Sequence, residues 1–257
     1  PLERLDAIYF SPHKFLGGPG SSGVLIFKAE LYKNRVPDNP GGGTVNWTNP
    51  WGEHSYIEEI EAREDGGTPS FLQTMRAALS IQLKEKMGVK QILEREHEQL
   101  AILWNRMKAI KGLHLLADNH PDRLGVISFY YEDIHYNLAV KILNDRFGIQ
   151  TRGGCSCAGT YGHYLLEVSY QKSRKIVNRI SHGDYSQKPG WVRLSIHPTM
   201  SNDEIIYIAE ALEALAENYK EWSTDYVYDL HKNEFYHRLK PSLEADLVDE
   251  WFDGVSF

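Results

Sequence analysis

The chain has 257 residues, of which 42% are hydrophobic and 25% are charged, a composition typical of a soluble globular protein with room for one or two domains. No apolar run approaches the roughly 20 residues that a membrane-spanning helix needs, and no signal-peptide pattern opens the chain, so we expect a cytoplasmic protein without a membrane anchor. The net charge of −7 argues against a broad nucleic-acid surface, and two cysteines only two positions apart do not make a disulfide framework.

The first predicted elements are two short buried strands at residues 6–10 and 23–27, which bracket a polar, glycine-rich turn. Residues 33–69 are rich in Gly, Pro, Asn and Trp and have no sustained period. A structureless loop of that length is more often functional than accidental, so we expect it to contribute to a site.

Two helices are predicted next, each from apolar residues that recur at helical spacing. The first begins after Pro69 and is interrupted by Gly88; its apolar positions are Leu72, Met75, Leu79 and Leu83. The second ends near Gly112, and its apolar positions are Leu93, Leu100, Trp104 and Met107.

A unit of alternating strands and helices follows, which implies an α/β domain. Strands are predicted at residues 124–131, 149–152 and 191–196. Helices are predicted at residues 137–147 and from a cap at Asn202 to about Tyr219. Residues 172–185 look like a basic helical insertion with a solvated face. The acidic, aromatic stretch 221–257 is best interpreted as a packed extension.

Lys14 is the first candidate catalytic residue. It lies in the turn between the first two strands, where desolvation can remove its proton and leave an amine nucleophile toward a carbonyl. Ser11 and His13 flank it as hydrogen-bond donors suited to an anionic group such as a phosphate. The alternative is a surface turn with a solvated lysine, and the motif alone leaves both interpretations open.

Two other glycine-rich segments are candidate anion sites. Residues 41–44, Gly-Gly-Gly-Thr, can form a backbone nest for a phosphate or a simple flexible turn. Thr68 lies in Glu-Asp-Gly-Gly-Thr-Pro just before a predicted helix, where its hydroxyl and the helix N-terminus can bind a phosphate together. The alternative for Thr68 is an N-cap that needs no ligand.

The second candidate catalytic residue is Cys157, in a glycine-rich loop at residues 150–163. Arg152 and His163 are close enough in sequence to depress a thiol pKa there, which makes a thiolate nucleophile plausible. Cys155 and Cys157 can instead be small buried hydrophobes. Two thiolates fall short of a structural zinc set, and a disulfide across two residues would be strained, so we predict no metal site here.

Arg193 is the candidate substrate-binding residue. It lies on the predicted strand at residues 191–196, in the sequence Val-Arg-Leu-Ser. An arginine on a strand that faces a site can bind a carboxylate as a bidentate fork, although most strand arginines are ordinary exposed charges.

The turn around Lys14 resembles the cofactor-lysine motif of class V aminotransferases and cysteine desulfurases, which are fold-type I enzymes that use pyridoxal 5'-phosphate (PLP). Further matches follow in order through about Tyr219, so the resemblance covers most of the chain. It implies that Lys14 forms a Schiff base with PLP and that Ser11 and His13 contact the phosphate. It also implies a homodimer, in which Thr68 reaches the phosphate held by the neighbouring subunit.

The cysteine loop resembles the Arg-x-Gly-x-x-Cys-Ala element of cysteine desulfurases and selenocysteine lyases, and its Cys-x-Cys form is also similar to that of molybdenum-cofactor sulfurases. The resemblance places Cys157 on the cysteine that accepts sulfur as a persulfide, which a sulfur-acceptor protein would then receive. Arg193 falls on the arginine that binds the carboxylate of an amino-acid substrate. Cys155 replaces a typically polar residue, and Gly159 with Thr160 replaces a proline-bearing continuation.

The fold class implied is α/β, the C-terminal part of a fold-type I PLP enzyme with an incomplete large domain and a complete small domain. We expect residues 1–70 to be the remnant of the large domain, 71–112 connecting helices, 113–220 the small α/β domain and 221–257 an extension. The family's lysine lies near the middle of the polypeptide, so we expect a fragment that binds PLP poorly and is inactive alone. The predicted function is cysteine desulfurase or selenocysteine lyase chemistry; the alternatives are amino-group transfer to a keto acid and an inactive interaction module.

Overall fold

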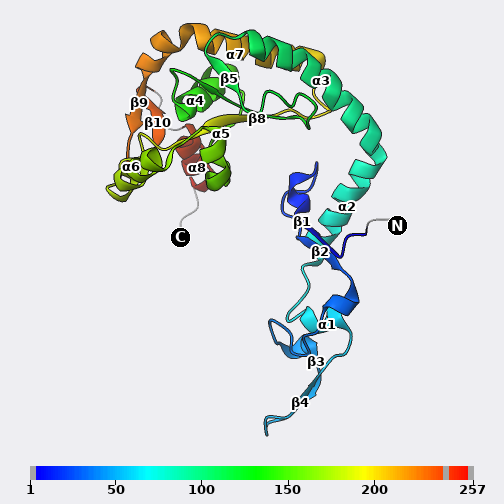
Figure 1. Ribbon diagram of the computed structural model, residues 1–257. Helices are drawn as coiled ribbons and strands as arrows, with labels where there is room; N and C mark the ends of the chain where they lie inside the picture. The colour runs from blue at the N-terminus through cyan, green and yellow to red at the C-terminus, as the bar shows by residue number, and fades with distance from the viewer. Residues whose placement is uncertain (1–3, 240–242, 254–257) are drawn as a thin grey trace. The chain divides into compact units, whose positions relative to one another are not determined.

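The computed structural model describes residues 4–239 and 243–253, and the chain divides into two compact units, residues 1–91 and 92–257 (Figure 1). The division falls within the segment expected to hold the connecting helices. No helix in the described ranges is both long and apolar enough to cross a membrane.

The two strands predicted around the lysine turn are confirmed. β1 (Ala7–Phe10) pairs antiparallel with β2 (Val24–Phe27), and between them lies the short 3-10 helix η1 (Pro12–Lys14). The prediction that the strands are buried is wrong for the described residues, because Tyr9 is 84% exposed and Leu25 is 62% exposed. A sheet of only two strands cannot close off either of its faces.

The prediction of a structureless loop at residues 33–69 is also wrong. After the 3-10 helices η2 (Ala29–Leu31) and η3 (Gly42–Thr44), the chain forms the antiparallel pair β3 (Val45–Thr48) and β4 (His54–Tyr56) and then helix α1 (Ile60–Glu64). The physical reason is the buried guanidinium of Arg63, which donates to the carbonyl oxygens of Ile57 at 2.7 Å, Glu58 at 2.8 Å and Asn34 at 3.2 Å. Contacts of this kind order a segment without giving it a local period.

The two long helices are confirmed as α2 (Phe71–Met87) and α3 (Val89–Ala109). Gly88 separates them with a φ of 79°, a left-handed conformation that glycine adopts at no steric cost. All of α2 belongs to the first unit, and all of α3 after Gln91 belongs to the second.

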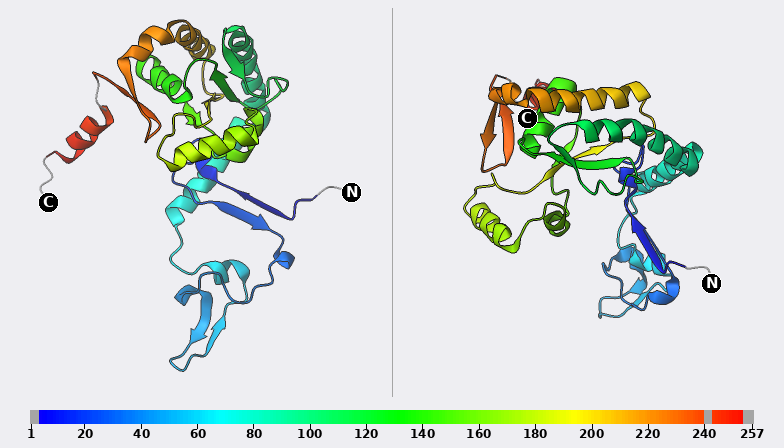
Figure 2. Two further views of the ribbon diagram at one scale, coloured as in Figure 1. Left: turned by 60° about the vertical axis from the view of Figure 1, so that its left-hand side comes forward. Right: turned by 45° about the horizontal axis from the view of Figure 1, so that its top comes forward.

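The second unit contains a four-stranded antiparallel sheet in the order β5-β6-β8-β7. Its strands are β5 (Leu113–Leu115), β6 (Val126–Tyr131), β8 (Trp191–Ser195) and β7 (Arg152–Gly154). One face of the sheet carries fully buried side chains such as Phe129 and Val192, and α3, α4 (Tyr136–Phe147) and α7 (Asn202–Trp222) pack against that face (Figure 2).

The strand expected at residues 149–152 starts later, at Arg152. Gly148 ends α4 in the left-handed conformation, with its N–H bonded to the carbonyl of Asn144, and the next N–H, of Ile149, donates to the carbonyl of Leu143 at 3.1 Å. The backbone around Ile149 therefore belongs to the helix cap and is not available to the sheet.

The cap of α7 is one residue earlier than expected. Ser201, not Asn202, is the N-cap, and it forms a reciprocal capping box with Glu204. The basic insertion is helical as expected, with α6 (Tyr170–Ser181) following α5 (Gly159–Leu165).

Beyond α7 and the short η4 (Ser223–Asp225), the predicted extension forms a hairpin of β9 (Tyr226–Asp229) and β10 (Glu234–His237), then helix α8 (Leu243–Phe252). The hairpin lies beside α4, as Figure 1 shows. Residues 240–242 and 254–257 of the predicted extension, and residues 1–3 of the predicted large domain, lie outside the described residues.

Candidate functional site

The lysine turn gathers three of the predicted site residues on four consecutive positions. Lys14 is the last residue of η1, and Ser11 is the residue directly before this helix. The N–H of Lys14 donates to the carbonyl of Ser11 at 3.3 Å. His13 and Lys14 are exposed and Ser11 is half-buried. Within the described residues, none of the three side chains has a hydrogen-bond or ion-pair partner, so all three remain available to a ligand.

Close backbone packing holds this turn in shape. A Cβ on Gly18 would lie 1.9 Å from the carbonyl oxygen of Pro12, so only glycine fits there. Residues 19–22 of the turn are bonded to α2 and its cap. Arg76 donates to the carbonyl of Pro19 at 2.8 Å, and Ser22 Oγ lies 3.0 Å from Ser70 Oγ.

The two other glycine-rich segments cross each other in the same unit. A Cβ on Gly41 would lie 2.0 Å from the carbonyl oxygen of Gly66. The Oγ1 of the buried Thr44 accepts from the N–H of Gly41 and donates to the carbonyl of the same residue. Residues 41–44 therefore form an ordered turn, so the prediction of a flexible turn is wrong, and their use as a backbone nest for a phosphate stays a prediction.

Thr68 is not an N-cap. The helix α2 begins at Phe71 with Ser70 in the cap position, which leaves Thr68 two residues outside it, exposed, and with a hydroxyl that has no partner in the described part of the chain. The joint use of this hydroxyl and the helix N-terminus for a phosphate stays a prediction.

Cys157 lies in a tight turn, within the segment that the sequence predicted only as a glycine-rich loop. The N–H of Ala158 donates to the carbonyl of Cys155 at 2.8 Å, and the two residues between them, Ser156 and Cys157, have φ values of 50° and 63°. Left-handed conformations of non-glycine residues cost on the order of 1 kcal/mol each, so this turn persists only if its surroundings hold it. Cys157 is exposed at its tip.

Cys155 has a different environment from Cys157. Its thiol donates to the carbonyl of Pro189 at 3.0 Å and is half-buried. Burial raises the pKa of Cys155, and the nearby ammonium of Lys188 opposes that rise only in part. Cys155 is therefore held as a neutral thiol.

Two arginines face each other beside the cysteine turn. Arg152 on β7 is directly opposite Arg193 on β8, and opposite residues of an antiparallel pair share one face of the sheet. Arg152 Nη2 also donates to Cys157 Sγ at 3.2 Å. The Nε of Arg193 is buried and has no hydrogen-bond partner within the described residues. Two guanidiniums and a thiol thus converge on one edge of the sheet, where an anion would relieve the repulsion between the like charges.

His163 takes no part in this cluster. Its Nδ1 lies 2.8 Å from the carbonyl of Gly159, and its Nε2 lies 2.9 Å from Ser173 Oγ. Both ring nitrogens therefore bond to groups other than Cys157. The prediction that His163 activates the thiol is not supported by this geometry. The opposition of Arg152 and Arg193 was not predicted from the sequence, although a strand placed at residues 152–154 would have revealed it by its register.

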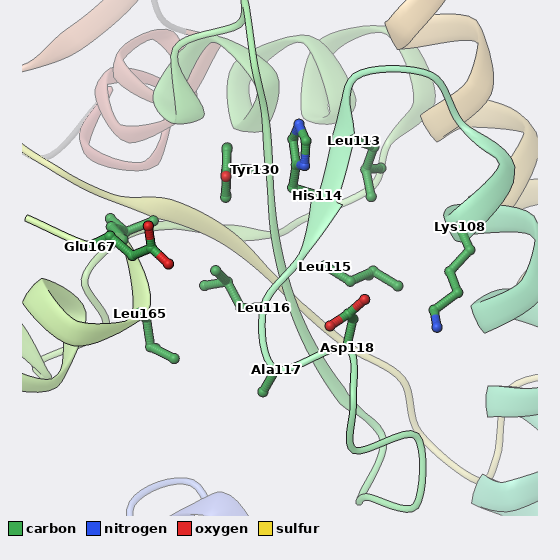
Figure 3. Close-up of a pocket in the computed structure, with 11 residues that line it drawn as sticks. Lys108, Leu113, His114, Leu115, Leu116, Ala117, Asp118, Tyr130, Leu165 and Glu167 are labelled. Carbon is green, nitrogen blue, oxygen red and sulfur yellow. The ribbon is translucent and has the colours of Figure 1, made fainter.

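The predicted residues form two clusters in two different units: Ser11, His13 and Lys14 in the first, and Arg152, Cys157 and Arg193 in the second. A separate cavity of about 570 Å³ lies in the second unit, where His114 stacks on Tyr130 near Lys108 and Glu167 (Figure 3). None of the predicted site residues lines it.

Comparison with known proteins gives a consistent result. The aminotransferase class V family model matches residues 3–208. A probable cysteine desulfurase of Staphylococcus epidermidis is 31% identical over 160 residues, which are 61% of this chain and 38% of that protein. A probable cysteine desulfurase of Staphylococcus aureus is 30% identical over 154 residues, or 60% of this chain and 36% of that protein.

Solved structures resemble the chain in fold. The apo structure of a cysteine desulfurase from Thermococcus onnurineus NA1 aligns with a TM-score of 0.62 at 24% identity, over 83% of this chain and 47% of that one. A cysteine desulfurase from Escherichia coli aligns with a TM-score of 0.62 at 19% identity, over 83% of this chain and 46% of that one. The expected fold class, part of a fold-type I α/β enzyme, is confirmed, and the chain spans less than half the length of these relatives.

Proposed function

Because this chain belongs to the class V aminotransferase family, whose model matches residues 3–208, we propose that it takes part in a cysteine desulfurase-like reaction with L-cysteine as substrate and Cys157 as the sulfur acceptor. One observation carries the proposal: an exposed thiol bonded to Arg152, which in turn lies opposite Arg193. A carboxylate held by the two guanidiniums would place an amino acid next to this thiol. In an aminotransferase that cysteine would have no role.

The lysine turn fits PLP as the cofactor. Ser11 and His13 offer donors for a phosphate, and Lys14 offers an amine for the aldehyde carbon, all within one turn and none of them paired with the described residues. When bound, PLP supplies an electron sink for bonds at the substrate Cα.

The chain's own residues then have separate tasks. Arg193, with Arg152, would bind the substrate carboxylate as a pair of forks and fix the orientation of the substrate. Lys14 Nζ would take the proton from Cα as general base. Cys157 Sγ would attack the substrate sulfur, so that an S–S bond forms as the Cβ–S bond breaks. L-cysteine and the Cys157 thiol give L-alanine and a persulfide on Cys157, a balance that needs no external oxidant or reductant.

Two finer points belong to the same proposal. Thr68, exposed and without a partner among the described residues, would contact the phosphate of a neighbouring subunit in a homodimer. The persulfide on Cys157 would pass its outer sulfur to the thiol of an acceptor protein, which leaves the Cys157 thiol as it began.

The open faces of β1 and β2 lead us to propose that the 257 residues alone bind PLP weakly and do not turn over. Apolar side chains on both faces of this pair, such as Ile8 and Leu25, are exposed in the described residues, whereas an antiparallel sheet ordinarily packs at least one face on a core. Titration of the chain with PLP, followed by absorbance, checks this: tight, saturable binding to Lys14 would contradict it.

The function itself is tested in an N-terminally extended protein loaded with PLP. The protein is incubated with L-cysteine, and the Cys157 peptide is weighed under non-reducing conditions. We expect the mass of one added sulfur atom on this peptide, retained in a Cys155→Ser variant, which is the matched control, and lost in Cys157→Ala.

Other outcomes identify the alternatives. An unmodified Cys157, with pyridoxamine phosphate accumulating from another amino acid, would make the protein an aminotransferase. An absence of both products in a protein that binds PLP would favour an inactive interaction module.

A further inference from the structure

The C-terminal hairpin lies beyond the residues that the family model matches, 3–208. It contacts α4 and the loop before β8, which lie next to the strands that flank the cysteine turn. Its two strands pair in register from Tyr226 with His237 to Asp229 with Glu234. Its tip ends at Asn233, which has a φ of 58°, a conformation that asparagine tolerates better than most residues.

Asn233 joins the hairpin to α4 by its side chain and its backbone. Its Nδ2 donates to the hydroxyl of Tyr136 at 2.8 Å, and its Oδ1 accepts from the hydroxyl of Tyr228 at 2.9 Å. Its carbonyl accepts from Asn137 Nδ2. The side chain of Asn233 is therefore bonded at both ends, and one of those bonds goes to the first residue of α4.

An aromatic cluster fills the space around these bonds. The ring of His135 stacks on Tyr136 with centroids 4.4 Å apart, and it also contacts Tyr228 and Phe235 of the hairpin, both at 5.3 Å. Rotation of the Tyr136 ring is limited by these neighbours as well as by the bond to Asn233.

The opposite side of the Tyr136 ring lies against the backbone of the cysteine turn's two strands. A Cβ on Gly190, just before β8, would lie 2.6 Å from Tyr136 Cε1 and 2.8 Å from the Cα of Gly154 on β7. A Cβ on Gly153 would lie 3.1 Å from Tyr136 Cδ2. The tyrosine thus packs where the end of β7 pairs with the start of β8, immediately before Cys155.

The hairpin also contacts the loop that leads into β8. The N–H of Tyr185 donates to the carbonyl of Leu230 at 3.0 Å, and His231 Nδ1 lies 2.9 Å from the carbonyl of Gly183. The segment after Tyr185 leads to Pro189, whose carbonyl accepts from the thiol of Cys155.

We propose that the β9–β10 hairpin is a positioning element that holds the cysteine turn in its strained shape, with Asn233 and Tyr136 as the positioning residues. The turn carries two consecutive left-handed non-glycine residues, which relax unless the flanking strands are fixed. Fixing β7 also fixes Arg152, and with it the contact between Arg152 and Cys157. This inference deepens the proposed function, since it identifies what keeps the sulfur-accepting thiol beside the carboxylate-binding arginines.

The test measures backbone hydrogen exchange in the full chain, without PLP or substrate. Tyr136→Phe removes the hydroxyl and keeps the ring; Asn233→Gly removes both side-chain bonds and keeps the left-handed backbone. We expect exchange at residues 152–158 to speed up about fivefold in Tyr136→Phe, the effect of one lost hydrogen bond, and by at least as much in Asn233→Gly, while α7 is unchanged. Tyr236→Phe is the matched control, because that hydroxyl donates to Glu234 on the same strand and has no hydrogen bond to α4 within the described residues.

A rescue variant separates positioning from general damage. Asn233→Asp offers oxygens to both phenols, so Tyr136 and Tyr228 can both donate to it, and we expect exchange to return to within about twofold of the parent protein. In the PLP-loaded, N-terminally extended protein, Tyr136→Phe should lower the rate of sulfur transfer to Cys157 more than it raises KM for L-cysteine, because Arg152 moves with β7 whereas Arg193 stays on β8.

Faster exchange confined to the hairpin, with residues 152–158 unaffected, would overturn the proposal, and so would unchanged exchange in both variants. If Asn233→Gly does not fold, Tyr136→Phe decides the question. Because exchange requires no reaction, a failed desulfurase assay leaves this result intact, and a neutral exchange result refutes the positioning role whatever the reaction is.

Discussion

Replacement of Arg193 by methionine should stabilise the second unit, although it removes a residue proposed to bind substrate. Arg193 lies directly opposite Arg152, and like charges in such a cross-strand pair destabilise a sheet by about 0.2–1 kcal/mol. The Nε of Arg193 is also buried without a partner in the described residues, and an unsatisfied buried donor costs about 1–3 kcal/mol. Methionine keeps the aliphatic stem and removes both penalties. After a discount for the half-buried position, we expect a gain of about 1–2 kcal/mol in the free energy of unfolding.

Urea unfolding followed by tryptophan fluorescence measures this change. Trp104 and Trp191 are buried in the second unit, whereas Trp47 and Trp51 of the first unit are exposed, so the signal reports chiefly on the second unit. A midpoint that rises with an unchanged slope shows that stability changed.

Arg152→Met is the matched control for Arg193→Met. The guanidinium of Arg152 is exposed and bonded to Cys157. Its replacement removes the repulsion between the arginines but also this bond, so we expect the free energy of unfolding to change by less than about 0.5 kcal/mol. If Arg193→Met instead destabilised the unit by about 1 kcal/mol or more, Arg193 would be a structural residue and its proposed role in carboxylate binding would lose its physical basis.

Three further predictions follow from packing and titration. Gly190→Ala should lower the free energy of unfolding by about 1–3 kcal/mol in urea, because the new Cβ would lie 2.6 Å from the Tyr136 ring; a change below about 0.5 kcal/mol would show that the ring moves freely. Leu103→Ala, at a fully buried position of α3, should cost about 2–5 kcal/mol, and a loss under about 1 kcal/mol would contradict the packed core described above. Burial lowers the pKa of His135, so its contribution to stability is fully present above the ordinary pKa of about 6.5 and is lost as pH falls below it. His135→Asn, which can still cap α4, should flatten the fall in stability as pH decreases below about 6.5, and an unchanged slope would assign that fall to other groups.

The sequence predicted the elements that depend on local pattern. The strands around Lys14 and the helices on either side of Gly88 were found, because apolar spacing and a glycine break are local signals. The predicted cap at Asn202 is one residue after the observed cap, Ser201. Serine and asparagine are both good N-caps, and only the reciprocal bond with Glu204 decides between them.

What the sequence did not predict depends on contacts between distant residues. Arg63 orders residues 33–69 through three carbonyls, none of which is visible as a period. The pairing of Arg152 with Arg193 depends on strand register, and a slip of one residue would turn one of them to the other face. The hairpin did leave a signal, because Tyr226–Asp229 and Glu234–His237 are rich in aromatic and β-branched residues and lie on either side of a mostly polar turn.

The turn at residues 155–158 explains why two cysteines in nearly the same place can have different chemistry. Cys155 is the last residue before the backbone reverses, so its thiol points to the carbonyl of Pro189 and burial raises its pKa. Cys157 comes after one left-handed residue and is left-handed itself, which puts its thiol at the exposed tip beside Arg152. The Cys157 thiol is therefore open to a reactant from outside the chain, whereas the Cys155 thiol is engaged by the carbonyl of Pro189. The difference in exposure between the two thiols therefore follows from the backbone of the turn, and any residue that holds that backbone in place also keeps the Cys157 thiol at the exposed tip.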